Sequence, residues 1–272
     1  RHACGEGRLR AGSLEVVSAP IVAVIGGGQL ARMMQEEAGA LGIHLRALVE
    51  AADGSTGQVT PDALVGAADD EAAVRAVVAG DGTQGPGGEP AAVVTFEHEH
   101  QNASLLERLQ AEGVSVQPAP QALELARDKL AMRRAMSQAG LPQPAWVEVG
   151  GPGQEAAEQM ADAVEAFAVE HGWPVVLKTP RGGYDGHGVL LVRSAESLHE
   201  GEAAEWLASV ARARAGQGDG RGTGGGGSLG GAAVTSLLVE QAIPFTRELA
   251  VLLARRPSGQ IAVWPVAQTV QD

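Results

Sequence analysis

The 272-residue sequence is poor in aromatic residues and in cysteine, and it has no long hydrophobic run. Aromatic residues make up 3% of the chain, so a core has to be built from Val, Leu, Ile and Ala. The single cysteine, Cys4, excludes a disulfide framework and a cysteine-based metal site. No apolar run approaches the length of a membrane-spanning helix. With 44% hydrophobic and 19% charged residues, the composition predicts a soluble globular protein.

Lysine is also scarce, and the charge balance is strongly acidic. The formal net charge is -13, which argues against a nucleic-acid surface because phosphate backbones require clustered cations. Of 20 basic residues only Lys129 and Lys178 are lysines. In a chain that otherwise uses arginine, these two positions suggest a need for a compact ammonium group.

The two ends of the sequence bear on compartment and completeness. The chain begins with Arg1 and stops at Asp272 just after a strand-like run, which suggests a fragment. The first twenty residues mix arginine with acidic residues, whereas transit peptides are poor in acids. We expect a cytoplasmic protein, or a plastid one if this tail is the remnant of a transit peptide.

The first half of the chain predicts an α/β unit. A β-branched strand at 21–25 is followed by a glycine turn, a helix ending at Gly42 and a second strand at 43–50. A third strand at 91–97 precedes a helix at 102–112, and the prolines of 114–120 mark a boundary. This order is that of a doubly wound domain.

The second half predicts one long helix and then mostly strands. The segment 120–140 reads as a single amphipathic helix with Leu123, Ala126, Leu130, Ala131 and Met136 on one face. The remaining expectations are a helix at 157–170, a hairpin of strands 173–178 and 189–194, a glycine-rich low-complexity insertion at 215–233, and strands at 236–243, 249–256 and 260–270.

The glycine turn after the first strand has two interpretations. Gly26, Gly28 and Ala31 match the dinucleotide-binding pattern, and Glu50 stands where a ribose-binding acid is expected. Backbone N–H groups at the helix start would then hold phosphate. The alternative is a plain turn in a domain that binds no dinucleotide, with Gln29 either a ligand-binding amide or an exposed first-turn residue.

The sequence "TFEHEH" at 95–100 lies at the carboxyl end of a predicted strand, where open α/β sheets bind ligands. Glu97 and Glu99 could accept from a substrate amine or hydroxyl. His98, Glu99 and His100 could be metal ligands, but no distant histidine completes a recognisable set, so a solvated loop is the preferred interpretation for both histidines.

The sequence "LKTPRGGYDGHG" at 177–188 predicts a phosphate site. A strand delivers Lys178, and the glycines that follow allow backbone N–H groups to approach phosphate oxygens. No Gly-Lys-Ser/Thr follows, so the pattern is not that of a P-loop. A flexible hairpin tip is the alternative. Further on, Glu240 and Glu248 are either nucleotide-binding groups or solvated acids at strand ends.

Taken together, these motifs resemble the ATP-grasp ligases, and within them the 5-(carboxyamino)imidazole ribonucleotide synthetases. Six segments from residue 21 onward carry the resemblance in the family's order: "GGGQLARM", "TFEHE", "RDKLAMR", "LKTPRGGYDGHG", "VEQAIPFTRE" and "WPVAQTVQD". The resemblance implies an irregular tail (1–20), a Rossmann-like pre-ATP-grasp domain (21–120), a linker helix with the ATP-grasp lid domain (121–239), and the start of a truncated C-terminal α+β domain (240–272).

The same resemblance implies roles for individual residues. The ATP-contacting set is Lys129, Lys178, Gly183, Tyr184, Asp185, Gly186, His187, Gly188, Val189, Glu240, Gln241, Ala242, Ile243, Glu248 and Gln271. Gln29 and Glu97 would bind aminoimidazole ribonucleotide, and Tyr184, Asp185 and His187 would be catalytic. Two departures are His187, where arginine is common, and "TFEHEH" in place of "TFEFEN".

The implied reaction is phosphorylation of bicarbonate by ATP to carboxyphosphate, followed by carboxylation of the ribonucleotide's amine. Mg²⁺ would assist, with its ligands beyond residue 272, so the fragment itself is expected to be inactive. The implied partners are small-molecule substrates, a second copy of the chain and a fused or separate carboxylase or mutase domain, as in eukaryotic phosphoribosylaminoimidazole carboxylase. Neither nucleic acid nor membrane is expected. An NAD-dependent dehydrogenase and a non-catalytic nucleotide-binding module remain as alternatives.

Overall fold

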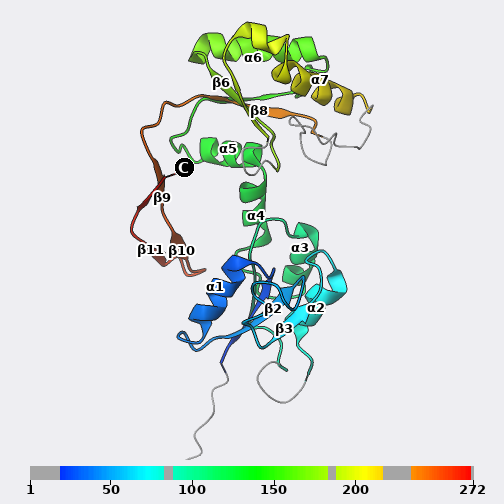
Figure 1. Ribbon diagram of the computed structural model, residues 1–272, viewed down its shortest axis with the longest axis vertical. Helices are drawn as coiled ribbons and strands as arrows, with labels where there is room; N and C mark the ends of the chain where they lie inside the picture. The colour runs from blue at the N-terminus through cyan, green and yellow to red at the C-terminus, as the bar shows by residue number, and fades with distance from the viewer. Residues whose placement is uncertain (1–18, 83–87, 183–187, 217–233, 271–272) are drawn as a thin grey trace, which may run out of the picture. The chain divides into compact units, whose positions relative to one another are not determined.

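A computed structural model describes residues 19–82, 88–182, 188–216 and 234–270. The chain divides into two compact units, Arg1–Arg127 and Asp128–Asp272, each with its own sheet (Figure 1). None of the helices within the described ranges has the length and apolar character that a membrane span requires. Most of the predicted tail and of the low-complexity insertion lies outside those ranges. The domain boundaries at 120/121 and 239/240 stay predictions.

The first unit contains a four-stranded parallel sheet in the order β3-β2-β1-β4. Its elements are β1 (Ile21–Ile25), α1 (Gln29–Ala38), β2 (His44–Val49), β3 (Ala63–Val65), α2 (Glu71–Ala79), β4 (Val93–Phe96), α3 (Ala103–Ala111) and α4 (Pro120–Arg127). The chain moves outward from β1 to β3 and then returns to place β4 on the other side of β1. This reversal creates a topological switch point between β1 and β4.

Helices cover both faces of this sheet because side chains alternate along β1. Ala23 and Ile25 face a core formed with α2, α3 and α4, whereas Val24 faces α1 through Ala31 and Ala38. The central strands β1 and β2 are therefore buried on both sides, which explains their largely apolar sequences. The predicted doubly wound α/β domain is confirmed.

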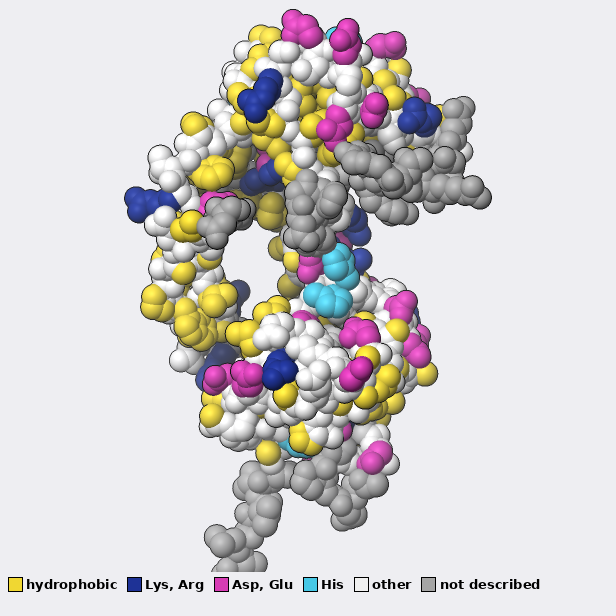
Figure 2. Space-filling view, in the orientation of Figure 1, with side chains coloured by type: hydrophobic (Ala, Val, Ile, Leu, Met, Phe, Trp, Pro, Cys, Tyr) yellow, Lys and Arg dark blue, Asp and Glu magenta, His cyan; other side chains and the backbone are white. Residues whose placement is uncertain are grey.

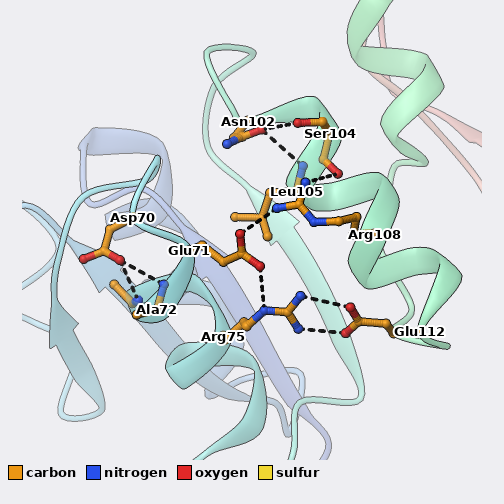
Figure 3. Close-up of polar contacts among 10 residues, drawn as sticks. Asp70, Glu71, Ala72, Arg75, Asn102, Ser104, Leu105, Arg108 and Glu112 are labelled. Atoms are coloured by element: carbon orange, nitrogen blue, oxygen red, sulfur yellow. Dashed lines mark hydrogen bonds and ion pairs between the residues drawn. The ribbon is translucent and has the colours of Figure 1, made fainter.

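The neighbouring helices α2 and α3 are also joined at the surface by an ion-pair network (Figure 3). Arg75 donates to both carboxylate oxygens of Glu112, at 2.7 and 2.9 Å, and also to Glu71. Arg108 donates to the second oxygen of Glu71 at 2.6 Å. Because all four side chains are exposed, the network is screened by salt and secondary to the apolar packing beneath it.

A buried arginine on β2 links this strand to neighbouring segments of the first unit. Arg46, 1% exposed, donates to Asp62 and to the backbone carbonyls of Val77 and Glu89, at 2.9–3.0 Å. The same oxygen of Asp62 also contacts His44 Nε2 at 2.8 Å. Burial of a guanidinium is tolerated here because its donors have acceptors.

The second unit is built on an antiparallel sheet in the order β5-β8-β6-β7. Its elements are α5 (Lys129–Gln138), β5 (Trp146–Val149), α6 (Ala157–His171), β6 (Val175–Lys178), β7 (Val189–Val192), the 3₁₀ turn η1 (Ala195–Leu198), α7 (Glu202–Arg214) and β8 (Leu237–Gln241). Helices α6 and α7 pack on one face of this sheet to form the core. Helix α5 lies on the opposite face (Figure 1).

The remaining strands form two short antiparallel pairs. Strand β9 (Glu248–Ala250) pairs with β12 (Ala267–Thr269), and β10 (Leu253–Arg255) pairs with β11 (Ile261–Val263). The predicted strands at 249–256 and 260–270 are therefore each divided in two. Many apolar side chains of these pairs are exposed, including Leu252 and Trp264, and hydrophobic groups are visible over β10 and β11 (Figure 2).

Two helix predictions are wrong in their bounds. The helix predicted to reach Gly42 ends at Ala38. The single helix predicted for 120–140 is two helices, because Asp128 has an extended backbone (φ −123°, ψ 109°) and caps α5 by accepting from the N–H groups of Leu130 and Ala131. Ala126 is exposed and does not share the buried face of Leu123 and Leu130.

Candidate functional site

The glycine turn of the first unit and the end of β4 meet at the switch point. Residues 26–28 follow β1, and Glu97 follows β4, its parallel neighbour in the sheet. The Glu97 carboxylate accepts from the backbone N–H of Gly28 at 2.5 Å and from that of Leu30 at 3.0 Å. Glu97 thus occupies the N-terminus of α1, where the helix dipole and unpaired N–H groups favour an anion.

This contact bears directly on the dinucleotide interpretation. The N–H groups that a cofactor phosphate would need are already bonded to a side chain of the same unit. A Cβ atom on Gly28 would lie 2.3 Å from Glu97 Oε1, and one on Gly27 would lie 2.8 Å from Val49 Cβ. The glycines are therefore explained by close packing inside the protein, and the pattern does not require NAD. Glu50 is exposed just after β2.

Gln29 lies beside this contact, at the first position of α1, and is exposed. Its Oε1 accepts from Ser55 Oγ at 3.1 Å. The adjacent Thr56 is fully buried and donates to the Gly28 carbonyl at 2.7 Å, so the loop after β2 is packed against the turn. The structure therefore brings the two predicted substrate-binding residues, Gln29 and Glu97, to the same turn.

The histidines after β4 form a local hydrogen-bonded loop. His98 Nδ1 lies 3.2 Å from the backbone N–H of His100 and 3.3 Å from Gln101 Nε2, and the His100 side chain is 57% exposed. The described residues contain no group of three or more His, Cys, Asp or Glu placed to hold a metal ion.

In the second unit, the sheet face opposite α6 and α7 carries the predicted phosphate-binding lysine. Because side chains alternate along a strand, Leu177 and Val239 point into the core while Lys178 and Glu240 point to the other face. Lys178 Nζ donates to Glu240 Oε2 at 2.6 Å. Arg133, from α5, donates through Nε to Glu240 Oε1 at 2.5 Å.

Glu240 is the buried centre of this cluster, at 3% exposure, so it is not the solvated acid of one sequence interpretation. Burial raises the pKa of its carboxyl, but the hydrogen bonds from Arg133 and Lys178 outweigh that effect and leave the pKa below its ordinary value. The carboxylate is therefore ionised at neutral pH. Arg133 is 11% and Lys178 26% exposed, so Lys178 is the more accessible of the two cations.

The second lysine is fixed at the base of the glycine loop. Lys129 Nζ donates to the carbonyls of Gly182 at 2.7 Å and Thr179 at 3.2 Å, and its backbone N–H donates to Pro180. Beside it, Arg181 donates to Asp128 at 2.9 Å. Burial lowers the pKa of Lys129, and the nearby positive charge of Lys178 lowers it further.

Several predicted site residues lie outside the described ranges: Gly183, Tyr184, Asp185, Gly186, His187 and Gln271. Gly188 (φ +69°) precedes β7, which begins at Val189 and pairs with β6 as the predicted hairpin. Gln241 ends β8, and Ala242 and Ile243 continue from it, with Ile243 46% exposed. Glu248 begins β9, opposite Thr269. The assignment of these residues to ATP stays a prediction.

Arg133 is the last residue of the motif "RDKLAMR", but the sequence alone assigns it no role. A usable signal was its spacing, because Lys129 and Arg133 are four residues apart and therefore lie on one face of a helix. Its partner Glu240 is 107 residues further along the chain, so their contact could not be found from local sequence.

Each of the two units matches a known protein family. Residues 20–127 match the ribonucleotide synthetase preATP-grasp domain, and residues 134–272 match the ATP-grasp domain. The chain belongs to the ATP-grasp family. The match to the ATP-grasp domain begins one residue after Arg133, and it includes Lys178, Glu240 and the glycine loop.

Individual relatives within the ATP-grasp family give a more specific similarity than the family match does. The chain is 42% identical over 253 residues to N5-carboxyaminoimidazole ribonucleotide synthase of Mycobacterium tuberculosis, covering 93% of this chain and 49% of that protein. It is also similar to the solved ADP complex of an N5-carboxyaminoimidazole ribonucleotide synthetase, with a TM-score of 0.69 and 27% identity over 93% of this chain and 55% of that one. These relatives confirm the resemblance inferred from the motifs.

A third comparison supports the fold alone. The Aspergillus clavatus N5-carboxyaminoimidazole synthase, solved with ADP and 5-aminoimidazole ribonucleotide, has a TM-score of 0.67 and 22% identity over 94% of this chain and 55% of that chain. The chain spans about half the length of the curated relatives it matches.

Proposed function

We propose that this ATP-grasp chain takes part in the ATP-dependent carboxylation of 5-aminoimidazole ribonucleotide by bicarbonate in purine biosynthesis. The observation that supports it most is the sheet face bearing Lys178, Glu240 and Arg133 at the base of a glycine-rich loop. The Mycobacterium tuberculosis relative named N5-carboxyaminoimidazole ribonucleotide synthase is identical to this chain at 42% of aligned residues. Carboxyphosphate would be the intermediate formed from bicarbonate and ATP.

In this proposal the two lysines bind the nucleotide phosphates. Lys178 presents a partly exposed ammonium group on the sheet face toward α5, and Lys129 adds a second positive charge near it. Positive groups fixed before the reaction stabilise charge that builds up on a transferring phosphoryl group. Backbone groups of Glu240–Ile243 would contact the adenine edge, and Glu248 would accept from ribose hydroxyls.

Gln29 and Glu97 would bind the ribonucleotide. The α1 N–H groups fix the orientation of the Glu97 carboxylate, so its remaining lone pairs point in a defined direction. A carboxylate oriented in this way can accept from the exocyclic amine that becomes carboxylated. Tyr184, Asp185 and His187 retain their proposed catalytic roles, although they lie outside the described residues.

We propose that Mg²⁺ assists the reaction and that the protein has protein partners. No group of three potential metal ligands occurs within the described ranges, so none of these residues is assigned to Mg²⁺. We further propose a homodimer, a fused or separate carboxylase or mutase domain as partner, and a cytoplasmic or plastid location.

Nucleotide binding by the purified protein tests the proposal. Isothermal titration with ATP should give saturable binding, and Lys178→Met should weaken it at least about tenfold because a phosphate contact is lost. Arg134→Met is the control, because Arg134 lies on α5 but pairs with Glu148 instead. Tight NADH binding without an ATP response would favour a dehydrogenase and contradict the proposal.

Turnover separates the enzyme from a non-catalytic nucleotide-binding module. The protein with its complete catalytic domain should release ADP only when bicarbonate is supplied, and should consume aminoimidazole ribonucleotide in equal amount. ATP binding with no turnover under these conditions would support the module and contradict the enzymatic proposal.

A further inference from the structure

On the sheet face toward α5, the second unit carries more positive than negative charge around Glu240. One carboxylate, Glu240, lies between two cations and gives each of them a separate oxygen. Arg133 and Lys178 together carry two positive charges against one negative charge, so the group keeps a net charge of about +1 at neutral pH. Lys178 is the more exposed of the two cations, so it is the one that a ligand can reach more easily.

We propose that Arg133 is a positioning residue that neutralises Glu240 and thereby leaves the charge of Lys178 available to a nucleotide phosphate. This inference rests on the proposed nucleotide-binding function and extends it to a residue that contacts no ligand. Without Arg133, Lys178 and Glu240 form a neutral pair. An incoming phosphate then competes for Lys178 with a carboxylate that has lost its direct ion pair to Arg133, while the charge of the nearby Lys129 still acts on both groups.

The structure fixes Arg133 in place from several directions. Its NH1 group lies 3.4 Å from Gln143 Oε1 and 3.8 Å from Met136 Sδ. Gln143 in turn donates to the Arg133 carbonyl at 3.3 Å and to Ser137 Oγ at 2.7 Å. The guanidinium is therefore oriented by Gln143 and Met136 as well as by Glu240, as expected for a support of the site.

The guanidinium suits this role better than an ammonium group would. Its Nε and NH1 donors point to two different acceptors at once, Glu240 and Gln143. A lysine at this position can retain the charge but cannot make both contacts in the same fixed geometry. Arg133→Lys should therefore keep part of the effect, whereas Arg133→Met should lose it.

The proposal predicts an effect that depends on the charge of the ligand. Loss of one positive charge should weaken ATP binding most, ADP binding less and adenosine binding not at all, because adenosine carries no phosphate. A purely structural role would lower the affinity for all three ligands by the same factor. This difference provides a readout that a general loss of packing does not produce.

Isothermal titration of wild type, Arg133→Met and Arg133→Lys with adenosine, ADP and ATP tests the inference. We expect Arg133→Met to weaken ATP binding about tenfold, with Arg133→Lys in between. Arg134→Met, one residue away on α5 and paired with Glu148, is the matched control and should bind like wild type. If Arg133→Met does not fold, Arg133→Gln removes the same charge with less loss of polar contact.

Lys178→Met separates failure of the inference from failure of the proposed function. If Lys178→Met leaves ATP affinity unchanged, the proposed phosphate site is wrong, and the inference falls with it. If Lys178→Met weakens ATP binding and Arg133→Met does not, only the inference is overturned. In the double variant, Arg133→Met should cause no further loss beyond that of Lys178→Met, because its effect acts through that lysine. Equal losses for adenosine and ATP would also overturn it.

Discussion

The Glu97 carboxylate lies directly over Gly28. It accepts the Gly28 backbone N–H at 2.5 Å, and a Cβ at position 28 would be 2.3 Å from its Oε1 atom. The pattern of glycines therefore serves a contact between two parts of one domain, 69 residues apart in the sequence. A motif associated with cofactor phosphates here binds a carboxylate supplied by the protein itself.

Gly28→Ala should destabilise the protein. The added methyl group displaces the Glu97 carboxylate, which leaves the N–H groups at the start of α1 without their acceptor. We expect the free energy of unfolding to fall by about 1–3 kcal/mol in urea denaturation. Gly39→Ala is the control, since its Cβ would meet nothing within 4 Å and its backbone is already helical. Equal effects of the two substitutions would contradict this account.

Asp128→Ala should lower both stability and ATP affinity. The side chain caps α5 and also accepts from Arg181 at the base of the glycine loop, so one substitution removes both contacts. Urea denaturation should show a loss of about 1–2 kcal/mol. Asp70→Ala removes a comparable cap from α2 and should lower stability without changing ATP affinity. An unchanged ATP affinity in Asp128→Ala would show that the cap is structural only.

Stability should depend on pH through Glu240. Its pKa is lowered in the folded state, so the unfolded chain binds more protons in the window just below its ordinary pKa of 4.5. The stabilisation is therefore fully present above that window and is lost as pH falls through the folded-state pKa. Urea denaturation from about pH 6 to about pH 3.5 should show a shallower decline for Glu240→Gln than for wild type.

Other carboxyls do not obscure this comparison. The pKa values of Glu71, Glu112 and Glu196 are also lowered, but these exposed groups are present in both proteins and their contribution cancels. Parallel pH profiles for wild type and Glu240→Gln would mean that the Glu240 cluster does not contribute to the pH dependence.

Local patterns were sufficient for much of the first unit and for the hairpin of the second. β1 and β4 were recognised because their apolar runs are bounded by clear breaks, and the β6–β7 hairpin because strands flank a glycine-rich turn. Strand β3 was missed because three residues are too few for a periodic signal. Helix α2 was missed although Val74, Val77 and Val78 have the spacing of one buried helix face and Asp70 caps it. The helix break at Asp128 was missed because the apolar spacing continues across it.

The sequence by itself determined which chemical groups are available and in what order. It supplied two lysines, a glycine-rich loop and acids at strand ends, and its motifs were sufficient to indicate the ATP-grasp family. Only the tertiary structure decided their partners. Glu97 turns back onto the α1 N–H groups, and Glu240 joins Lys178 to Arg133, because strands pair elements that are distant in sequence. Electrostatic effects depend on distance and burial, which a linear sequence does not specify.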